Sequence, residues 1–177
     1  MTTNIIITGF GGQGILFIGK ILAYAALMKG KELSWLPSYG PEMRGGTANC
    51  HVIISDEPVG SPIIQTPDIL ISMNKPSLDK FEDKVAKGGH IIIDSTLIDR
   101  KIKRDDVNAV YADATKIATD SGKGSLANMV MLGALLKETG LFTLDEIKAG
   151  LLKTIPPKKQ NLAGLNMEMI EKGYNIK

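Results

Sequence analysis

Nine consecutive residues carry most of the chemistry in this chain: Ser38-Tyr39-Gly40-Pro41-Glu42-Met43-Arg44-Gly45-Gly46. Three glycines and a proline exclude an ordinary helix or strand, so we predict a loop. Arg44 suits bidentate pairing with a carboxylate or phosphate, whereas Glu42 could lock Arg44 or cap backbone donors. Ser38 and Tyr39 add hydroxyl groups, and Gly45 and Gly46 permit close backbone approach. Polar groups on a loop favour recognition, either of a ligand or of another protein.

A second glycine-rich segment, Gly9-Phe10-Gly11-Gly12-Gln13-Gly14, fits G-x-G-x-x-G between a predicted strand and a predicted helix. The free N–H groups and the positive end of that helix would favour an anionic group such as phosphate. An equally supported alternative is that the glycines only let strand, turn and helix pack closely. The ligand-binding hypothesis makes candidates of Gly9, Gly11, Gly12, Gln13 and Gly14.

A classical NAD-binding domain needs an Asp or Glu at the end of its second strand, about 20 residues after the glycines. The second predicted strand, residues 33–36, instead runs into Pro37-Ser38-Tyr39. A hydride-transferring dehydrogenase is therefore disfavoured. The sequence also contains no Gly-Lys-Ser/Thr of a P-loop and no Gly-x-Ser-x-Gly elbow. No spacing of carboxylates and histidines predicts a metal site.

Cys50 is the only cysteine, which excludes an internal disulfide and an iron–sulfur cluster ligated by this chain alone. It precedes His51 in a predicted strand, where neighbouring side chains point to opposite faces. We therefore expect a half-buried thiol beside a surface histidine. Asn128 stands at a predicted helix start, where an N-cap and a ligand contact are equally supported.

Short strands that are apolar throughout alternate with amphipathic helices, which is typical of a parallel sheet covered on both faces. The sequence predicts one α/β domain over residues 1–177, a Rossmann-like three-layer fold with a largely parallel sheet. Strands are predicted at residues 4–8, 33–36, 47–55, 68–72, 90–94 and 107–112. Helices are predicted from residue 15, from residue 76, over 113–120, 128–137 and 144–153, and from 162. The helix from residue 76 is expected to carry Leu78, Phe81 and Val85 on its apolar stripe.

The overall charge and hydropathy limit the kinds of partner that we expect for this chain. Lysine plus arginine is 21 against 19 for aspartate plus glutamate, so charge gives no case for nucleic acid or an anionic membrane. No apolar run approaches the roughly 20 residues of a membrane span. The first residues lack a signal peptide pattern, and we expect a cytoplasmic protein.

Over nearly its whole length the chain resembles the gamma subunit of the 2-oxoacid:ferredoxin oxidoreductases. The segment at residues 38–46 resembles the 2-oxoglutarate and branched-chain types more than the pyruvate type. The resemblance rests on both glycine-rich segments, on Pro67-Asp68-Ile69-Leu70, on Asn128 with Leu132-Gly133-Ala134, and on the tail at residues 166–174.

The resemblance implies a multi-subunit enzyme that oxidatively decarboxylates a 2-oxoacid and transfers the acyl group to coenzyme A, with electrons passing to ferredoxin. Thiamine diphosphate, Mg and iron–sulfur clusters would sit on thiamine-binding alpha and beta subunits and a ferredoxin-like subunit. This chain would supply no catalytic residue and bind no cofactor alone, and self-association of the isolated chain stays open. The alternative is a stand-alone nucleotide-binding oxidoreductase or a nucleotide-binding module.

Overall fold

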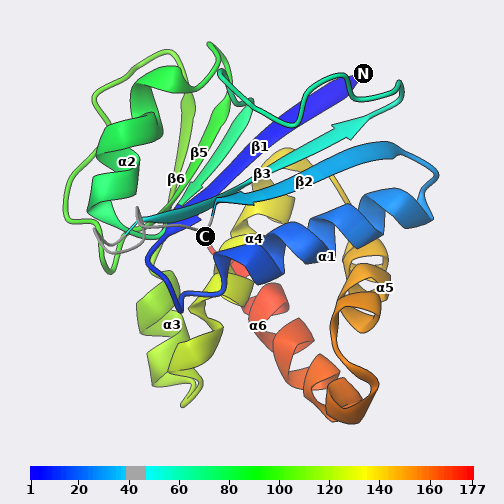
Figure 1. The fold of residues 1–177 in the computed structure, drawn as a ribbon. Helices are drawn as coiled ribbons and strands as arrows, with labels where there is room; N and C mark the ends of the chain where they lie inside the picture. The colour runs from blue at the N-terminus through cyan, green and yellow to red at the C-terminus, as the bar shows by residue number, and fades with distance from the viewer. Residues whose placement is uncertain (39–46) are drawn as a thin grey trace.

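The computed structural model describes residues 1–38 and 47–177. Within these residues six strands form one sheet in the order β2-β3-β1-β4-β5-β6 (Figure 1). The strands are β1 (Thr2–Gly9), β2 (Glu32–Ser38), β3 (Ala48–Ser55), β4 (Ile69–Ser72), β5 (His90–Asp94) and β6 (Asn108–Ala112). β1, β4, β5 and β6 pair in parallel, while β3 runs antiparallel to both β1 and β2. The predicted α/β fold with a largely parallel sheet is confirmed.

Both faces of the sheet are buried, and successive side chains along a strand alternate between the two cores. Ile5 and Ile7 face one core, and Ile6 faces the other. Among the described helices, α2 (Lys75–Phe81), followed by the 3₁₀ turn η2 (Glu82–Lys84), covers the second core, as Figure 1 shows, together with loop residues such as Ile64 and Ile98. The first core is covered by α1 (Ile15–Met28), α3 (Ala114–Asp120), α4 (Ala127–Thr139), α5 (Leu144–Thr154) and α6 (Ala163–Tyr174). This arrangement gives the three layers and explains why the strands are apolar throughout.

The helices that cover the first core are held in place by capping hydrogen bonds at α5 and by close contact between α4 and α6. The predicted capping box of α5 is confirmed: Thr143 Oγ1 accepts from the Glu146 N–H at 3.2 Å, and Glu146 Oε2 accepts from the Thr143 N–H at 2.8 Å. α4 and α6 cross in contact at Gly133 and Gly173. A Cβ at Gly133 would lie 1.9 Å from the carbonyl oxygen of Ile170.

Two local expectations are corrected. The helix that begins near Pro76 was expected to carry Val85 on its apolar stripe, but α2 ends at Phe81, and Val85 is extended although buried. After α2 ends, the Arg104 guanidinium donates hydrogen bonds to the carbonyls of Glu82 and Val85. Cys50 was expected to be half-buried, but it is fully buried because its side of β3 faces α1.

Candidate functional site

The two glycine-rich segments begin at the same edge of the sheet. The antiparallel pairing places Gly9, the last residue of β1, opposite Ala48, and Ser38, the last residue of β2, opposite Asn49. The sheet therefore brings Ser38, where the second segment begins, to the same edge as Gly9, where the first begins. Five of the candidates lie outside the described residues: Tyr39, Glu42, Arg44, Gly45 and Gly46.

The loop at residues 10–14 lies where the chain leaves two neighbouring strands for opposite faces of the sheet. The chain after β1 enters α1 on one face of the sheet, and the chain after the neighbouring strand β4 enters α2 on the opposite face. In open α/β sheets ligands bind in the crevice at such a point, beyond the carboxyl ends of the strands. The glycine segment is therefore in the expected position for a binding loop.

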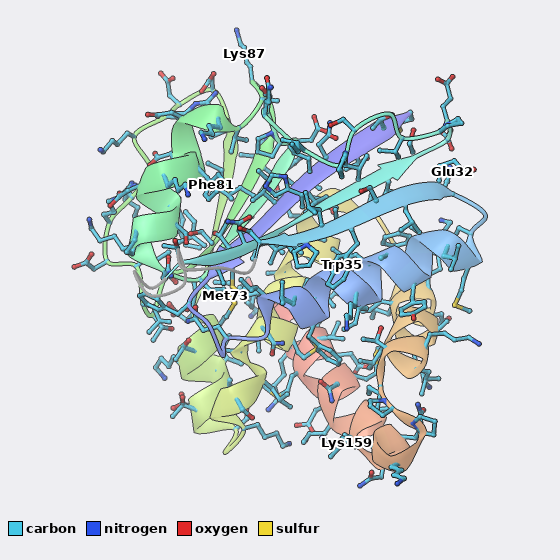
Figure 2. The ribbon with its side chains drawn as sticks, in the orientation of Figure 1. Glu32, Trp35, Met73, Phe81, Lys87 and Lys159 are labelled. Atoms are coloured by element: carbon cyan, nitrogen blue, oxygen red, sulfur yellow. The ribbon has the colours of Figure 1, made fainter. Side chains whose placement is uncertain are left out.

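Gln13 spans this crevice. Its Oε1 accepts from the Phe10 N–H at 2.5 Å, and its Nε2 donates to the carbonyl of Met73, just after β4, at 3.2 Å. Figure 2 shows Met73 beside the stretch that leads from β1 into α1. A Cβ at Gly9 would lie 2.6 Å from Gln13 Oε1. The contact at Gly9 is the kind that the close-packing alternative predicts for the glycines, and Gln13 holds the loop to the chain after β4.

Gly14 and Asn128 join the beginnings of two helices. Gly14 is the N-cap of α1 with φ +74, and no side chain caps that end. Asn128 Nδ2 donates to the Gly14 carbonyl at 3.2 Å. A Cβ at Gly14 would lie 2.3 Å from that nitrogen, so only glycine fits both the left-handed backbone and the contact.

The N-cap interpretation of Asn128 is wrong. α4 begins one residue earlier, at Ala127, and its N-cap is Leu126. Asn128 is 4% exposed, and its Oδ1 has no hydrogen-bond partner among the described residues. The amide therefore positions α4 against the glycine loop and leaves one buried acceptor unused.

A shallow hollow of about 290 Å³ opens beside the loop. Its lining combines the loop glycines with the first turn of α1 and with Phe10, whose side chain is 41% exposed. No lining residue is ionisable. The first turn of α1 contains no acidic residue, so its N–H groups and the helix dipole favour a negative or polar group. The lining residues are Phe10, Gly11, Gly12, Gly14, Ile15, Leu16, Phe17 and Ala48.

Cys50 and His51 point to opposite faces of β3, as predicted. Burial raises the pKa of the Cys50 thiol to about 12, so it stays protonated and unreactive. His51 Nδ1 accepts from the Ile64 N–H at 3.0 Å. Burial first, and then Lys84, lowers the pKa of His51.

Over residues 1–38 and 47–177, no group of three or more His, Cys, Asp or Glu side chains is arranged to hold a metal ion.

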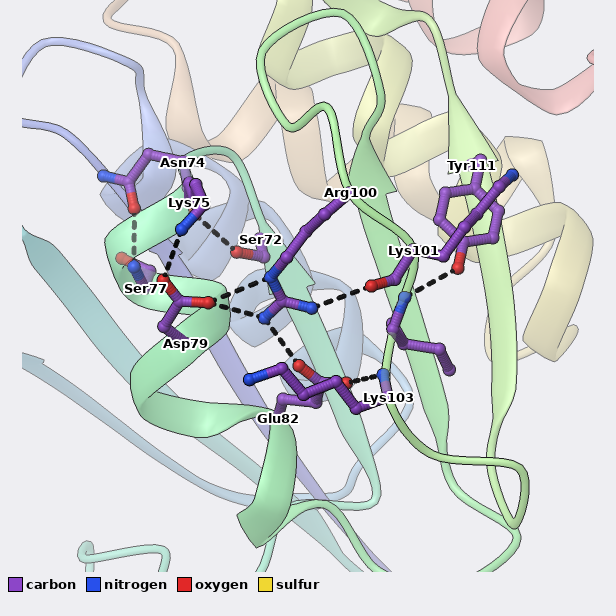
Figure 3. A network of polar contacts seen from close by, with 11 residues as sticks. Ser72, Asn74, Lys75, Ser77, Asp79, Glu82, Arg100, Lys101, Lys103 and Tyr111 are labelled. Carbon is purple, nitrogen blue, oxygen red and sulfur yellow. Dashed lines mark hydrogen bonds and ion pairs between the residues drawn. The ribbon is translucent and has the colours of Figure 1, made fainter.

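An ionic network that the sequence did not reveal fastens the loop before β6 onto α2 (Figure 3). Arg100 donates to Asp79 at 2.6 and 2.9 Å and to Glu82 at 2.6 Å. Glu82 is 2% exposed and also accepts from the Lys103 N–H. Lys75, and then Arg100, lowers the pKa of Asp79. Arg100 lies 21 residues from Asp79 and 18 from Glu82, and the three residues form no motif. No local pattern could therefore have identified the network, whose role is structural.

Comparison with known proteins identifies the family. The model of the pyruvate ferredoxin/flavodoxin oxidoreductase family matches residues 4–176. The chain belongs to this family. Along the described part of the chain, no helix is both long and apolar enough to cross a bilayer.

Relatives of this oxidoreductase family differ in length. Ketoisovalerate oxidoreductase subunit VorA of Methanothermobacter thermautotrophicus is 45% identical over 168 residues, which is 94% of this chain but 35% of VorA. The chain thus spans about a third of that relative. The 2-oxoglutarate synthase subunit KorC of Methanocaldococcus jannaschii is 36% identical, covering 99% of this chain and 94% of KorC. The predicted similarity to the 2-oxoglutarate and branched-chain types is confirmed.

A solved structure supports the same assignment. The gamma subunit of the keto/oxoacid ferredoxin oxidoreductase from Geobacter sulfurreducens has a TM-score of 0.82 and 30% identity, covering 97% of this chain and 96% of that subunit. The 2-oxoglutarate:ferredoxin oxidoreductase from Magnetococcus marinus, at 24% identity and a TM-score of 0.85, shows the fold alone.

Proposed function

We propose that this chain is the gamma subunit of a 2-oxoacid:ferredoxin oxidoreductase, which oxidatively decarboxylates a 2-oxoacid to an acyl-CoA and CO₂ while reducing ferredoxin. The family match over residues 4–176 carries the proposal. The whole chain acts as one domain, residues 1–177, and the 2-oxoacid is 2-oxoglutarate or a branched-chain acid. The names of VorA and KorC support this choice of substrate.

The cofactors of the reaction belong to partner chains in this proposal. Iron–sulfur clusters need thiolate ligands, and the Mg ion that holds the diphosphate of thiamine diphosphate needs oxygen ligands such as carboxylates. The one thiol of this chain is buried with a raised pKa. The partners are thiamine-binding alpha and beta subunits and a ferredoxin-like subunit, all in the cytoplasm. This chain completes the assembly and shapes the approach to its active centre.

The stand-alone nucleotide oxidoreductase is less well supported by the geometry. Classical dinucleotide binding uses a second strand parallel and adjacent to the first. Here β3 separates β2 from β1, so no residue at the end of β2 takes the position of the ribose-binding acid. Gln13 also spans the crevice between β1 and β4.

Purification from the native host tests the main proposal. A tagged copy of this chain should retain the thiamine-binding and cluster-binding chains, and the complex should reduce ferredoxin only with a 2-oxoacid and coenzyme A. Parallel assays with 2-oxoglutarate, a branched-chain 2-oxoacid and pyruvate identify the substrate. Recovery of the chain without such partners, or tight NAD(P) binding by the purified chain, refutes the assignment.

We further propose that the hollow beside Gly11, Gly12 and Gly14 receives an anionic group, for which the phosphates of coenzyme A are the candidate that the reaction supplies. Leu16 lines this hollow in the first turn of α1. Leu16→Glu adds a negative charge there, and Leu16→Gln is the uncharged control of the same size. In the complex, the Glu variant should raise the KM for coenzyme A at least tenfold over the Gln variant. Equal KM values refute an anion at this position.

A further inference from the structure

The Gln13 side chain lies between two strands at the point where their pairing would otherwise continue. β1 and β4 pair in parallel as far as Thr8 and Ser72, and beyond them the Met73 N–H donates to the Thr8 carbonyl at 3.0 Å. In a parallel ladder the next hydrogen bond would run from the Phe10 N–H to the Met73 carbonyl. Both groups bond to the Gln13 amide instead, through Oε1 at 2.5 Å and Nε2 at 3.2 Å. One amide group therefore separates the two backbones here.

The two backbone groups define what this crevice can recognise. The Phe10 N–H requires an acceptor, the Met73 carbonyl requires a donor, and the width of one amide separates them. Gln13 supplies the acceptor and the donor from a single amide group. It therefore occupies the crevice as an internal ligand would. An amide of another molecule carries the same two groups, so the crevice has the hydrogen-bonding pattern of an amide-binding site.

The surroundings of Gln13 allow its side chain to leave the crevice. Gln13 is only half-buried, and it stands between Gly12 with φ +89 and Gly14 with φ +74. Nothing lies within 4 Å of a Cβ placed at Gly12, so the outer side of the loop is open. Glycine has the widest choice of backbone conformations. The two glycines can therefore act as pivots on which Gln13 turns outward.

The crevice adjoins the hollow of about 290 Å³ beside the glycine loop. Phe10 belongs to both, because it lines the hollow and its N–H forms one side of the crevice. In the proposed function this hollow receives the phosphates of coenzyme A. The first amide of the pantetheine arm of coenzyme A follows the diphosphate after a short aliphatic chain. Hollow and crevice thus lie next to each other, as the diphosphate and the first amide do in coenzyme A.

We propose that Gln13 is an internal occupant that coenzyme A displaces, and that the crevice between β1 and β4 then binds an amide of the pantetheine arm. One amide replaces another, so the Phe10 N–H and the Met73 carbonyl keep their hydrogen bonds. Gln13 lowers the apparent affinity for coenzyme A, because only molecules with the side chain turned outward can bind the amide. This inference rests on the proposed function, from which it takes coenzyme A.

The test uses the complex purified from the native host through a tagged copy of this chain. Two fragments of coenzyme A compete with it: S-methylpantetheine, which has the amides but cannot accept the acyl group, and adenosine 3′,5′-bisphosphate, which has no amide. Gln13→Ala and Gln13→Ser both vacate the crevice, and either one suffices if it melts like the wild type. Gln160→Ala is the matched control, because Gln160 also bridges backbone groups, the carbonyls of Leu152 and Ile155.

The short variants should lower the inhibition constant of S-methylpantetheine at least tenfold, while that of the bisphosphate and both constants of Gln160→Ala stay at the wild-type values. An unchanged or higher constant for S-methylpantetheine in the short variants overturns the inference. An equal fall for both fragments, or a fall in Gln160→Ala, also overturns it, because a loosened chain rather than a vacated crevice would then explain the result. Failure of the wild-type complex to require coenzyme A refutes the proposed function instead.

Discussion

Substitution of Gly14 by alanine measures how tightly the glycine loop is joined to α4. A left-handed backbone costs a residue with a Cβ about 1–2 kcal/mol, and Gly14 has φ +74. The new Cβ would also lie 2.3 Å from Asn128 Nδ2, and overpacking of this kind costs about 1–3 kcal/mol. Gly14→Ala should therefore lower the free energy of unfolding by about 2–5 kcal/mol in total.

Gly12→Ala is the matched control. Gly12 has φ +89, but nothing lies within 4 Å of a Cβ placed there, so only the backbone cost of about 1–2 kcal/mol applies. Combining Gly14→Ala with Asn128→Ala should reduce the cost of the Gly14 substitution to the same value. Urea unfolding, followed by circular dichroism, measures five proteins: the wild type, the single variants Gly14→Ala, Gly12→Ala and Asn128→Ala, and the double variant. Equal costs at Gly12 and Gly14, or no coupling between Gly14 and Asn128, would refute the reasoning.

Three other predictions concern the scaffold. Glu82→Gln should lower the free energy of unfolding by about 2–4 kcal/mol, because Arg100 loses the buried one of its two carboxylate partners, Glu82 and Asp79; a change below about 0.5 kcal/mol in urea unfolding would contradict this. Burial keeps the pKa of His51 below 6.5 in the folded chain, so the folded state binds fewer protons and stability should fall as the pH drops below about 6.5. His51→Gln, whose amide oxygen can still accept the hydrogen bond from the Ile64 N–H, should remove this pH dependence of stability. If melting curves show that wild type and variant lose the same stability between pH 7 and pH 5, the prediction is wrong. Gly133→Ala should cost about 3 kcal/mol or more by forcing α4 from α6, whereas Gly164→Ala, with nothing within 4 Å, should be neutral or stabilising in thermal melts.

Strand and helix positions could be predicted because each element carries its own local signal. Runs such as Ile5-Ile6-Ile7 are apolar throughout because both faces of the sheet are covered, and the capping box at Thr143 marks the start of α5 without tertiary information. The position of β2 could not be predicted. Its pairing with β3 rather than β1 depends on contacts between distant residues, which no local pattern contains.

The candidate site was predictable only in part, for the same reason. The G-x-G-x-x-G spacing located the loop and its helix, and Asn128 was identified as notable from its position. Its contact with the Gly14 carbonyl spans 114 residues of sequence, so its role became visible only in the fold. The Gln13 bridge to Met73 likewise depends on β1 and β4 lying side by side.

The Gln13 bridge has a consequence for how related sequences can be sorted. One side chain closes the place where doubly wound proteins usually admit a dinucleotide, and its two hydrogen bonds need an amide with both a donor and an acceptor. A homologue with alanine or serine at this position would have the same scaffold with an open crevice. The residue type at position 13 thus decides whether both hydrogen bonds can form, because an amide side chain can make them and a shorter side chain cannot.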